Sequence, residues 1–140
     1  MFNKILLASD GSEHALKATE KAKMLALNNP AASIEIVYVV NGSTTKTDVL
    51  HNWNTLDVEQ QQRERLKQTE QCLISAGISY EIRILHGEPG PALVDFANHH
   101  DFDCLVIGSR GLNSLQEMVL GSVSHKVAKR ANCPVLIVKN

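Results

Sequence analysis

The sequence predicts an α/β protein with a single doubly wound, five-stranded parallel sheet and helices on both faces. Five short apolar runs alternate with segments of helical periodicity, and this order is typical of parallel strands joined by right-handed crossovers. Two runs, KILLAS and DCLVIG, are almost continuously apolar, as in strands buried on both faces. A third run, SYEIRIL, alternates and is expected near an edge. The predicted strands are residues 4–9, 33–40, 79–85, 103–108 and 134–139.

The first two predicted helices are bounded by recognisable capping residues. Ser12 is a suitable N-cap for a helix that reaches residues 28–30. The second helix spans about 55–76, where Asp57 and Gln60 resemble a capping box. Gly77 stands where a glycine commonly terminates a helix.

The last two predicted helices lie in the second half of the chain. One covers about 91–100, and Pro91 suits its first turn. The other follows Gly121, with Ser122 as its expected cap, and its apolar residues recur at every fourth position from Val123. Together these segments indicate one domain over residues 1–140.

Composition narrows the class of protein. Apolar residues make up 44% of the 140 residues, so a folded core is expected. The net charge is −1 and no basic run occurs, so we expect no nucleic-acid partner. No apolar run is long enough to cross a membrane and no signal peptide is recognised, which predicts a cytoplasmic protein. The three cysteines have no metal-binding spacing, and Cys104 and Cys133, which flank strand-like runs, are interpreted as small buried thiols.

A glycine-containing loop follows the fourth predicted strand, where doubly wound folds bind ligands. Gly108 ends the strand, Gly111 follows it, and Gly121 precedes the last helix after nine further residues. A helix N-terminus favours phosphate, and Ser122 and Ser124 could add hydroxyl donors. Arg110 could add a positive charge. On spacing alone, the interpretation of these glycines as turn and cap residues is as open as that of a phosphate-binding loop. No Walker A loop occurs.

At these residues the sequence resembles the universal stress protein family. The family's ATP-binding pattern, Gly-x2-Gly-x9-Gly-Ser/Thr, is met in full, and the resemblance covers the whole chain. KILLASDGSEHALKA looks like the family's first strand and Asp-containing loop, and IVYVV looks like its second strand. SHKVAKRANCPVLIVKN looks like its closing helix and strand.

This resemblance implies a Rossmann-like sheet of order 3-2-1-4-5, of the adenine nucleotide alpha hydrolase kind. It implies ATP, or AMP or ADP, as ligand, with Mg²⁺ bound to the phosphates. Asp10 would contact the ribose or the metal, Ala8 would line the adenine pocket, and Val39 would meet the adenine edge through its backbone. The ribose and phosphates would be surrounded by Gly108, Gly111, Gly121, Ser122 and Val123. Family members usually form homodimers through the last strand, here Val135, Leu136, Ile137 and Val138.

The expected activity is binding, with slow hydrolysis or none. Phosphoryl transfer needs charge stabilisation and a placed nucleophile, and the loop offers Arg110 but no lysine and no evident base. A sensor or switch in the stress response is therefore expected, and an ATPase or phosphotransferase and a nucleotide-free dimeric scaffold are the alternatives. A receiver domain is excluded because Asp10 stands alone and no aspartate ends the third strand. The polar connector 41–54 and Trp53 match no family motif.

Overall fold

All five predicted strands form one parallel sheet in the order β3-β2-β1-β4-β5, so the expected topology is confirmed. The structure, a computed structural model, describes residues 2–40, 63, 64, 66–109 and 121–139. β3 lies at one edge, as its alternating sequence predicts, and β5 lies at the other. The elements are β1 (Lys4–Ala8), α1 (Glu13–Ala26), β2 (Ser33–Val40), α4 (Lys67–Ser75), β3 (Ser79–His86), α5 (Pro89–His99), β4 (Cys104–Gly108), α6 (Ser122–Arg130) and β5 (Val135–Val138).

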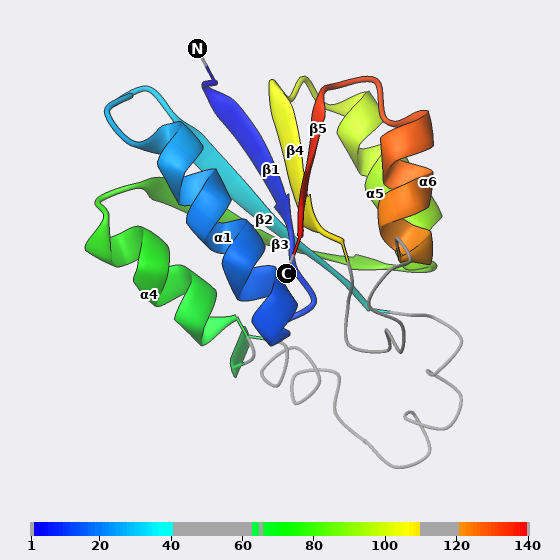
Figure 1. Cartoon of the computed structure of the whole chain (residues 1–140), viewed down its shortest axis with the longest axis horizontal. Helices are drawn as coiled ribbons and strands as arrows, with labels where there is room; N and C mark the ends of the chain where they lie inside the picture. Colours follow the sequence, from blue (N-terminus) through cyan, green and yellow to red (C-terminus); the bar gives the residue numbers. More distant parts are fainter. Residues whose placement is uncertain (1, 41–62, 65, 110–120, 140) are drawn as a thin grey trace.

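The helices cover the two faces of the sheet in pairs (Figure 1): α1 and α4 lie on one face, α5 and α6 on the other. Successive strand residues point to opposite faces, so β1 contributes to two separate cores. Ile5 and Leu7 join the core beneath α1 and α4, whereas Leu6 joins the core beneath α5 and α6. All three side chains are fully buried, which explains why this strand is apolar throughout.

Helix α1 begins where the sequence predicts. Ser12 is the N-cap, and its Oγ accepts a hydrogen bond from the backbone N–H of Ala15 at 3.2 Å. Alanines are buried at every third or fourth position of this helix, and small side chains let the helix axis lie close to the sheet. These residues are Ala15, Ala18, Ala22 and Ala26.

Helix α4 is the described part of the predicted 55–76 segment. It extends over Lys67–Ser75, and Arg63 and Glu64 are also helical. The predicted capping box at 57–60, the connector 41–54 and Trp53 lie outside the described residues. Gly77 has φ +70°, so the prediction of a left-handed residue after this helix is confirmed.

The starts of α5 and α6 differ slightly from those expected. Helix α5 begins at Pro89, two residues before the approximate start, and Pro91 lies in its first turn as predicted, where a missing N–H costs nothing. In α6 the N-cap is Gly121, and Ser122 is the first helical residue. The backbone explains the second difference: the N–H of Gly121 binds the carbonyl oxygen of Ser109 at 2.8 Å, which fixes the start of the helix one residue earlier.

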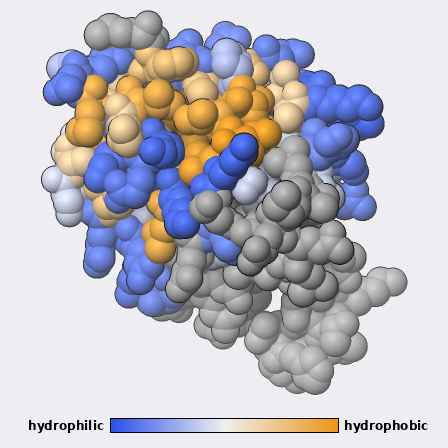
Figure 2. All heavy atoms as spheres, viewed as in Figure 1, coloured by the Kyte–Doolittle hydropathy of each residue, from blue (hydrophilic) through white to orange (hydrophobic). Residues whose placement is uncertain are grey.

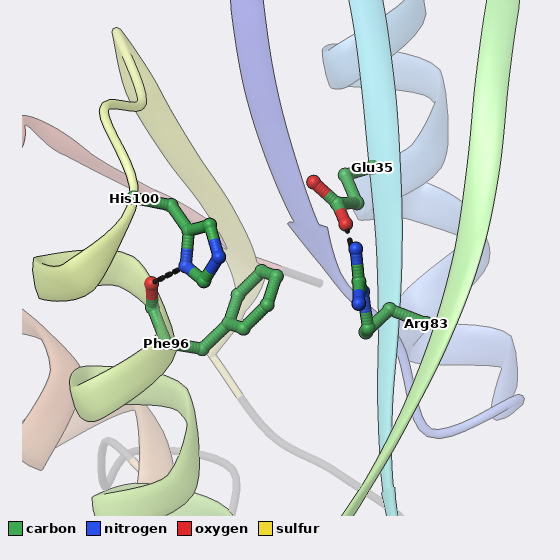
Figure 3. Close-up of polar contacts among 4 residues, drawn as sticks. All are labelled: Glu35, Arg83, Phe96 and His100. Atoms are coloured by element: carbon green, nitrogen blue, oxygen red, sulfur yellow. Dashed lines mark hydrogen bonds and ion pairs between the residues drawn. The ribbon is translucent and has the colours of Figure 1, made fainter.

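The far end of α5 packs on β2 and β3 through an aromatic and charged cluster (Figure 3). Arg83 Nε lies 3.0 Å from Glu35 Oε1, and the guanidinium lies 5.4 Å from the Phe96 ring centroid. The His100 ring lies 4.2 Å from that of Phe96, and its Nδ1 is 2.9 Å from the Phe96 carbonyl oxygen. This cluster anchors the C-terminal end of α5. The N-terminal end of the helix lies at the carboxyl ends of the strands, since α5 follows the end of β3 directly.

Candidate functional site

The carboxyl ends of the two central strands, β1 and β4, define the candidate site. The chain crosses from β1 to its neighbour β2 on one side, and from β4 to β5 on the other, so the strand order reverses between them. In doubly wound sheets this reversal point is where ligands bind. Ala8 ends β1 and Gly108 ends β4, and both residues are buried. The predicted site residues that follow them therefore begin at the same edge.

The turn from β1 to α1 is held by its own side chains. Asp10 Oδ1 accepts a hydrogen bond from the backbone N–H of Ser12 at 3.0 Å, and Ser9 Oγ accepts one from Gly11 at 3.3 Å. Gly11 has φ +78°, which few other residues adopt without strain. The Asp10 side chain is half-buried and stands at the start of α1, close to the end of β1. Its carboxylate is thus positioned at the switch point by an interaction that also orders the turn.

Two hydrogen bonds fix the start of α6 beside the end of β4, and a third joins the end of β4 to β5. The third runs from the N–H of Ser109 to the carbonyl oxygen of Val138 at 2.9 Å, whereas the N–H of Gly121 binds the carbonyl oxygen of Ser109 at 2.8 Å. The buried hydroxyl of Ser124 donates to the carbonyl oxygen of Gly108 at 2.5 Å. The last of these was not anticipated: this hydroxyl, expected to face phosphates, joins the helix to the strand.

The N-terminus of α6 has no side-chain cap, because its N-cap residue is Gly121. The next three backbone N–H groups, of Ser122, Val123 and Ser124, have no intrahelical acceptor, and the positive end of the helix dipole lies there. Ser122 is exposed and Val123 is half-buried, so the helix end is open to a ligand. This arrangement suits a phosphate group.

A cleft of about 230 Å³ opens between the N-terminal turns of α5 and α6. Its lining residues are Glu88, Pro89, Gly90, Pro91, Ser122, Val123 and Lys126. Of these residues, only Ser122 and Val123 were predicted from the sequence. Two signals could have pointed to the others. The strand before Glu88, β3, has its carboxyl end on the same side of the sheet, and Lys126 follows Ser122 by four positions, which places both on one helix face.

The remaining predicted residues are distributed as follows. Val39 lies near the carboxyl end of β2 and is half-buried. His125 is exposed, in agreement with the solvent-facing interpretation. Arg110 and Gly111 lie outside the described residues.

Among the described residues, no group of three or more histidines, cysteines, aspartates and glutamates could hold a metal ion. None of the described helices is sufficiently long and apolar for a membrane span.

The cysteines are remote from this chemistry. Cys104 is buried in β4, and burial raises the pKa of its thiol. Cys72 lies on α4, where its Sγ is 3.3 Å from Glu20 Oε1, and burial again raises the thiol pKa. A raised pKa keeps a thiol protonated and weakly nucleophilic. Cys133 is half-buried rather than buried as expected, and burial raises the pKa of its thiol as well. None of the three cysteines therefore adds a reactive group to the candidate site.

These features define a doubly wound α/β protein with an uncapped helix N-terminus at its switch point. The sequence matches the universal stress protein family over residues 1–139, and the chain belongs to this family. The universal stress protein YxiE of Bacillus subtilis (strain 168) is 34% identical over 149 residues, covering 99% of this chain and 100% of YxiE.

Solved structures agree with this assignment. Hypothetical protein MJ0577 superposes with a TM-score of 0.88 at 28% identity, covering 100% of this chain and 97% of that one. A universal stress protein solved in complex with cAMP has a TM-score of 0.71 at 27% identity, covering 99% of this chain and 97% of its own. The fold of this chain is therefore that of universal stress proteins.

Proposed function

We propose that this universal stress protein binds ATP at the switch point and acts as a nucleotide-dependent switch in the stress response. The observation that carries the proposal is the uncapped N-terminus of α6, which Ser124 and Gly121 hold beside the end of β4. A related protein solved with cAMP supports an adenine nucleotide as the ligand.

Each predicted site residue has a role in this proposal. Ala8 and the backbone of Val39 meet the adenine ring, and Asp10 faces the ribose or the phosphate-bound metal. The backbone of the glycine loop surrounds the ribose and phosphates, and Arg110 adds a positive charge. Ser124 positions the helix and leaves phosphate binding to its backbone N–H. The loop residues are Gly108, Gly111, Gly121, Ser122 and Val123.

Mg²⁺ is proposed to arrive with the nucleotide. This ion commonly binds through substrate phosphates and one or two carboxylates, and it retains several waters. Asp10 provides a carboxylate at the carboxyl end of β1.

We propose binding with slow hydrolysis or none. A loose, highly charged transition state needs several placed charges and an oriented nucleophile. At the described carboxyl ends of the strands, the uncapped start of α6 supports holding a phosphate, whereas the carboxylate of Asp10 adds no positive charge to stabilise its transfer. A slow ATPase remains the second candidate, and multiple-turnover hydrolysis that is lost in Asp10→Ala would establish it.

The binding test uses charge at the start of α6. Titration calorimetry with ATP and Mg²⁺ is expected to give a measurable affinity for the wild type and a large loss for Ser122→Glu. The new carboxylate repels phosphate, yet it favours the helix dipole, so thermal stability should be kept or raised. Ser122→Gln is the matched control, because it has similar size without the charge.

The outcomes of this test are distinct. Equal ATP affinity in Ser122→Glu and Ser122→Gln would show that the phosphates do not bind at the start of α6. A wild type that neither copurifies with an adenine nucleotide nor gives heat with ATP would favour a nucleotide-free scaffold. Loss of ATP affinity in Gly111→Val would give independent support for phosphates bound by the glycine loop.

We also propose that two copies of the 1–140 domain pair through β5. This strand forms an edge of the sheet, and an open apolar edge invites pairing with another chain. Leu136 is 37% exposed, and a hydrophobic area lies over β5 between α1 and α6 (Figure 2). Val135, Ile137 and Val138 complete the strand that a partner would meet.

A further inference from the structure

The cleft between α5 and α6 adjoins the proposed phosphate site at the start of α6. Ser122 and Val123 belong both to the proposed phosphate site and to the lining of the cleft, so a ligand at the start of α6 lies beside the cleft. Its volume of about 230 Å³ is smaller than the roughly 300–1,000 Å³ typical of pockets for whole drug-sized ligands. The cleft therefore suits part of a nucleotide rather than all of it.

Lys126 supplies the positive charge of this cleft. Its stem crosses the first turn of α5 at Gly90, where an added Cβ would lie 2.9 Å from Lys126 Cδ. Gly90 is buried, and its missing side chain provides the room in which the lysine stem lies. The ion pairs found among the described residues join other side chains. Lys126 is thus held at the wall of the cleft with its charge available.

Glu88 supplies the opposing charge. It is the N-cap of α5, yet it makes no side-chain cap hydrogen bond, and it lines the cleft with Lys126. A carboxylate here disfavours a bare polyphosphate. A divalent cation bound to the phosphates reduces that repulsion.

We propose that the cleft receives the β- and γ-phosphates of the nucleotide and that Lys126 pairs with the terminal phosphate. The site then prefers the triphosphate to the monophosphate, and Glu88 makes this preference depend on a divalent cation. This inference rests on the proposed function, because it needs the α-phosphate at the start of α6. It adds the two residues that distinguish ATP from AMP.

The experiment compares ATP and AMP affinities of the wild type, Lys126→Gln and Lys129→Gln in the presence of Mg²⁺. Lys126→Gln is expected to weaken ATP binding about threefold to tenfold, between the values of an exposed ion pair and of a charge-assisted hydrogen bond. AMP binding should be unchanged. Lys129→Gln is the matched control, since it removes an exposed lysine of the same helix that does not line the cleft. Lys126→Arg should retain the preference for ATP.

Glu88 provides an independent readout. With Mg²⁺ removed by a chelator, Glu88→Gln is expected to bind ATP more tightly than the wild type, with AMP affinity unchanged. An ATP-to-AMP affinity ratio that Lys126→Gln leaves at the wild-type value would overturn the inference while the proposed function stands. A wild type that binds neither nucleotide would overturn both.

Discussion

Ser124 donates a hydrogen bond from its Oγ to the carbonyl oxygen of Gly108 at 2.5 Å, joining the first turn of α6 to the last residue of β4. The Ser124 side chain is 3% exposed, so water cannot readily replace this bond. The loop between these residues is also closed by the bond from Gly121 to Ser109. The N-terminus of α6 is therefore set by the strand rather than by its own capping residue.

Ser124→Ala is expected to lower the free energy of unfolding by about 1–3 kcal/mol, because it leaves a buried carbonyl oxygen without its donor. Urea unfolding followed by circular dichroism measures this change. Ser122→Ala is the control, since Ser122 is exposed and its loss should cost within about 0.5 kcal/mol. Equal stabilities of the two variants would mean that the hydrogen bond to Gly108 contributes little.

Gly77→Ala is expected to destabilise the protein by about 1–2 kcal/mol through backbone strain alone. Gly77 has φ +70°, whereas no described atom lies within 4 Å of an added Cβ, so crowding is not the cause. Gly77→Asn should cost less, because asparagine tolerates the left-handed conformation. Urea midpoints of the two variants test this order, and a more stable Gly77→Ala would contradict it.

Local signals in the sequence predicted most of the fold. Strands buried on both faces produce continuous apolar runs, so KILLAS and DCLVIG identified β1 and β4. Gly77 was predictable because its role depends on one backbone angle and not on distant contacts. The strand order, by contrast, came from the resemblance to universal stress proteins, since periodicity alone does not specify which strands are neighbours.

The parts that sequence reasoning missed depend on contacts between distant segments. Serine is generally a better N-cap than glycine, which favoured Ser122, but the bond between Gly121 and Ser109 determines the actual start of α6. Glu88 and Lys126 meet at one cleft only because α5 and α6 pack side by side. The spacing of Ser122 and Lys126 places those two on one helix face, but no local pattern places Glu88 beside them.

Asp103 is expected to make stability depend on acid pH. Its Oδ2 accepts hydrogen bonds from the backbone N–H groups of Lys4 and Asn3, each at 2.9 Å, and these lower its pKa below the ordinary 3.8. A lowered folded-state pKa stabilises the protein above the unfolded pKa, and this contribution is lost as pH falls through the folded pKa.

The wild type should therefore lose stability more steeply than Asp103→Asn as the pH is lowered below about 4. Urea unfolding at several pH values measures the two slopes. Asp101→Asn is the matched control, because it removes an exposed carboxylate from the same connection between α5 and β4. Parallel curves for the wild type and Asp103→Asn would show that the bonds to Asn3 and Lys4 do not favour the ionised form.

Leu136→Lys is expected to convert a dimer into a monomer. Leu136 is 37% exposed on the edge strand β5, and a lysine there opposes pairing of two edges through charge and desolvation. Sedimentation velocity over a range of concentrations measures the change. Ile74→Lys is the control, since Ile74 is 61% exposed on α4, away from that edge, and its replacement should leave the dimer intact. A wild type that sediments as a monomer at every concentration would refute the dimer, whereas a dimeric Leu136→Lys would move the interface away from β5.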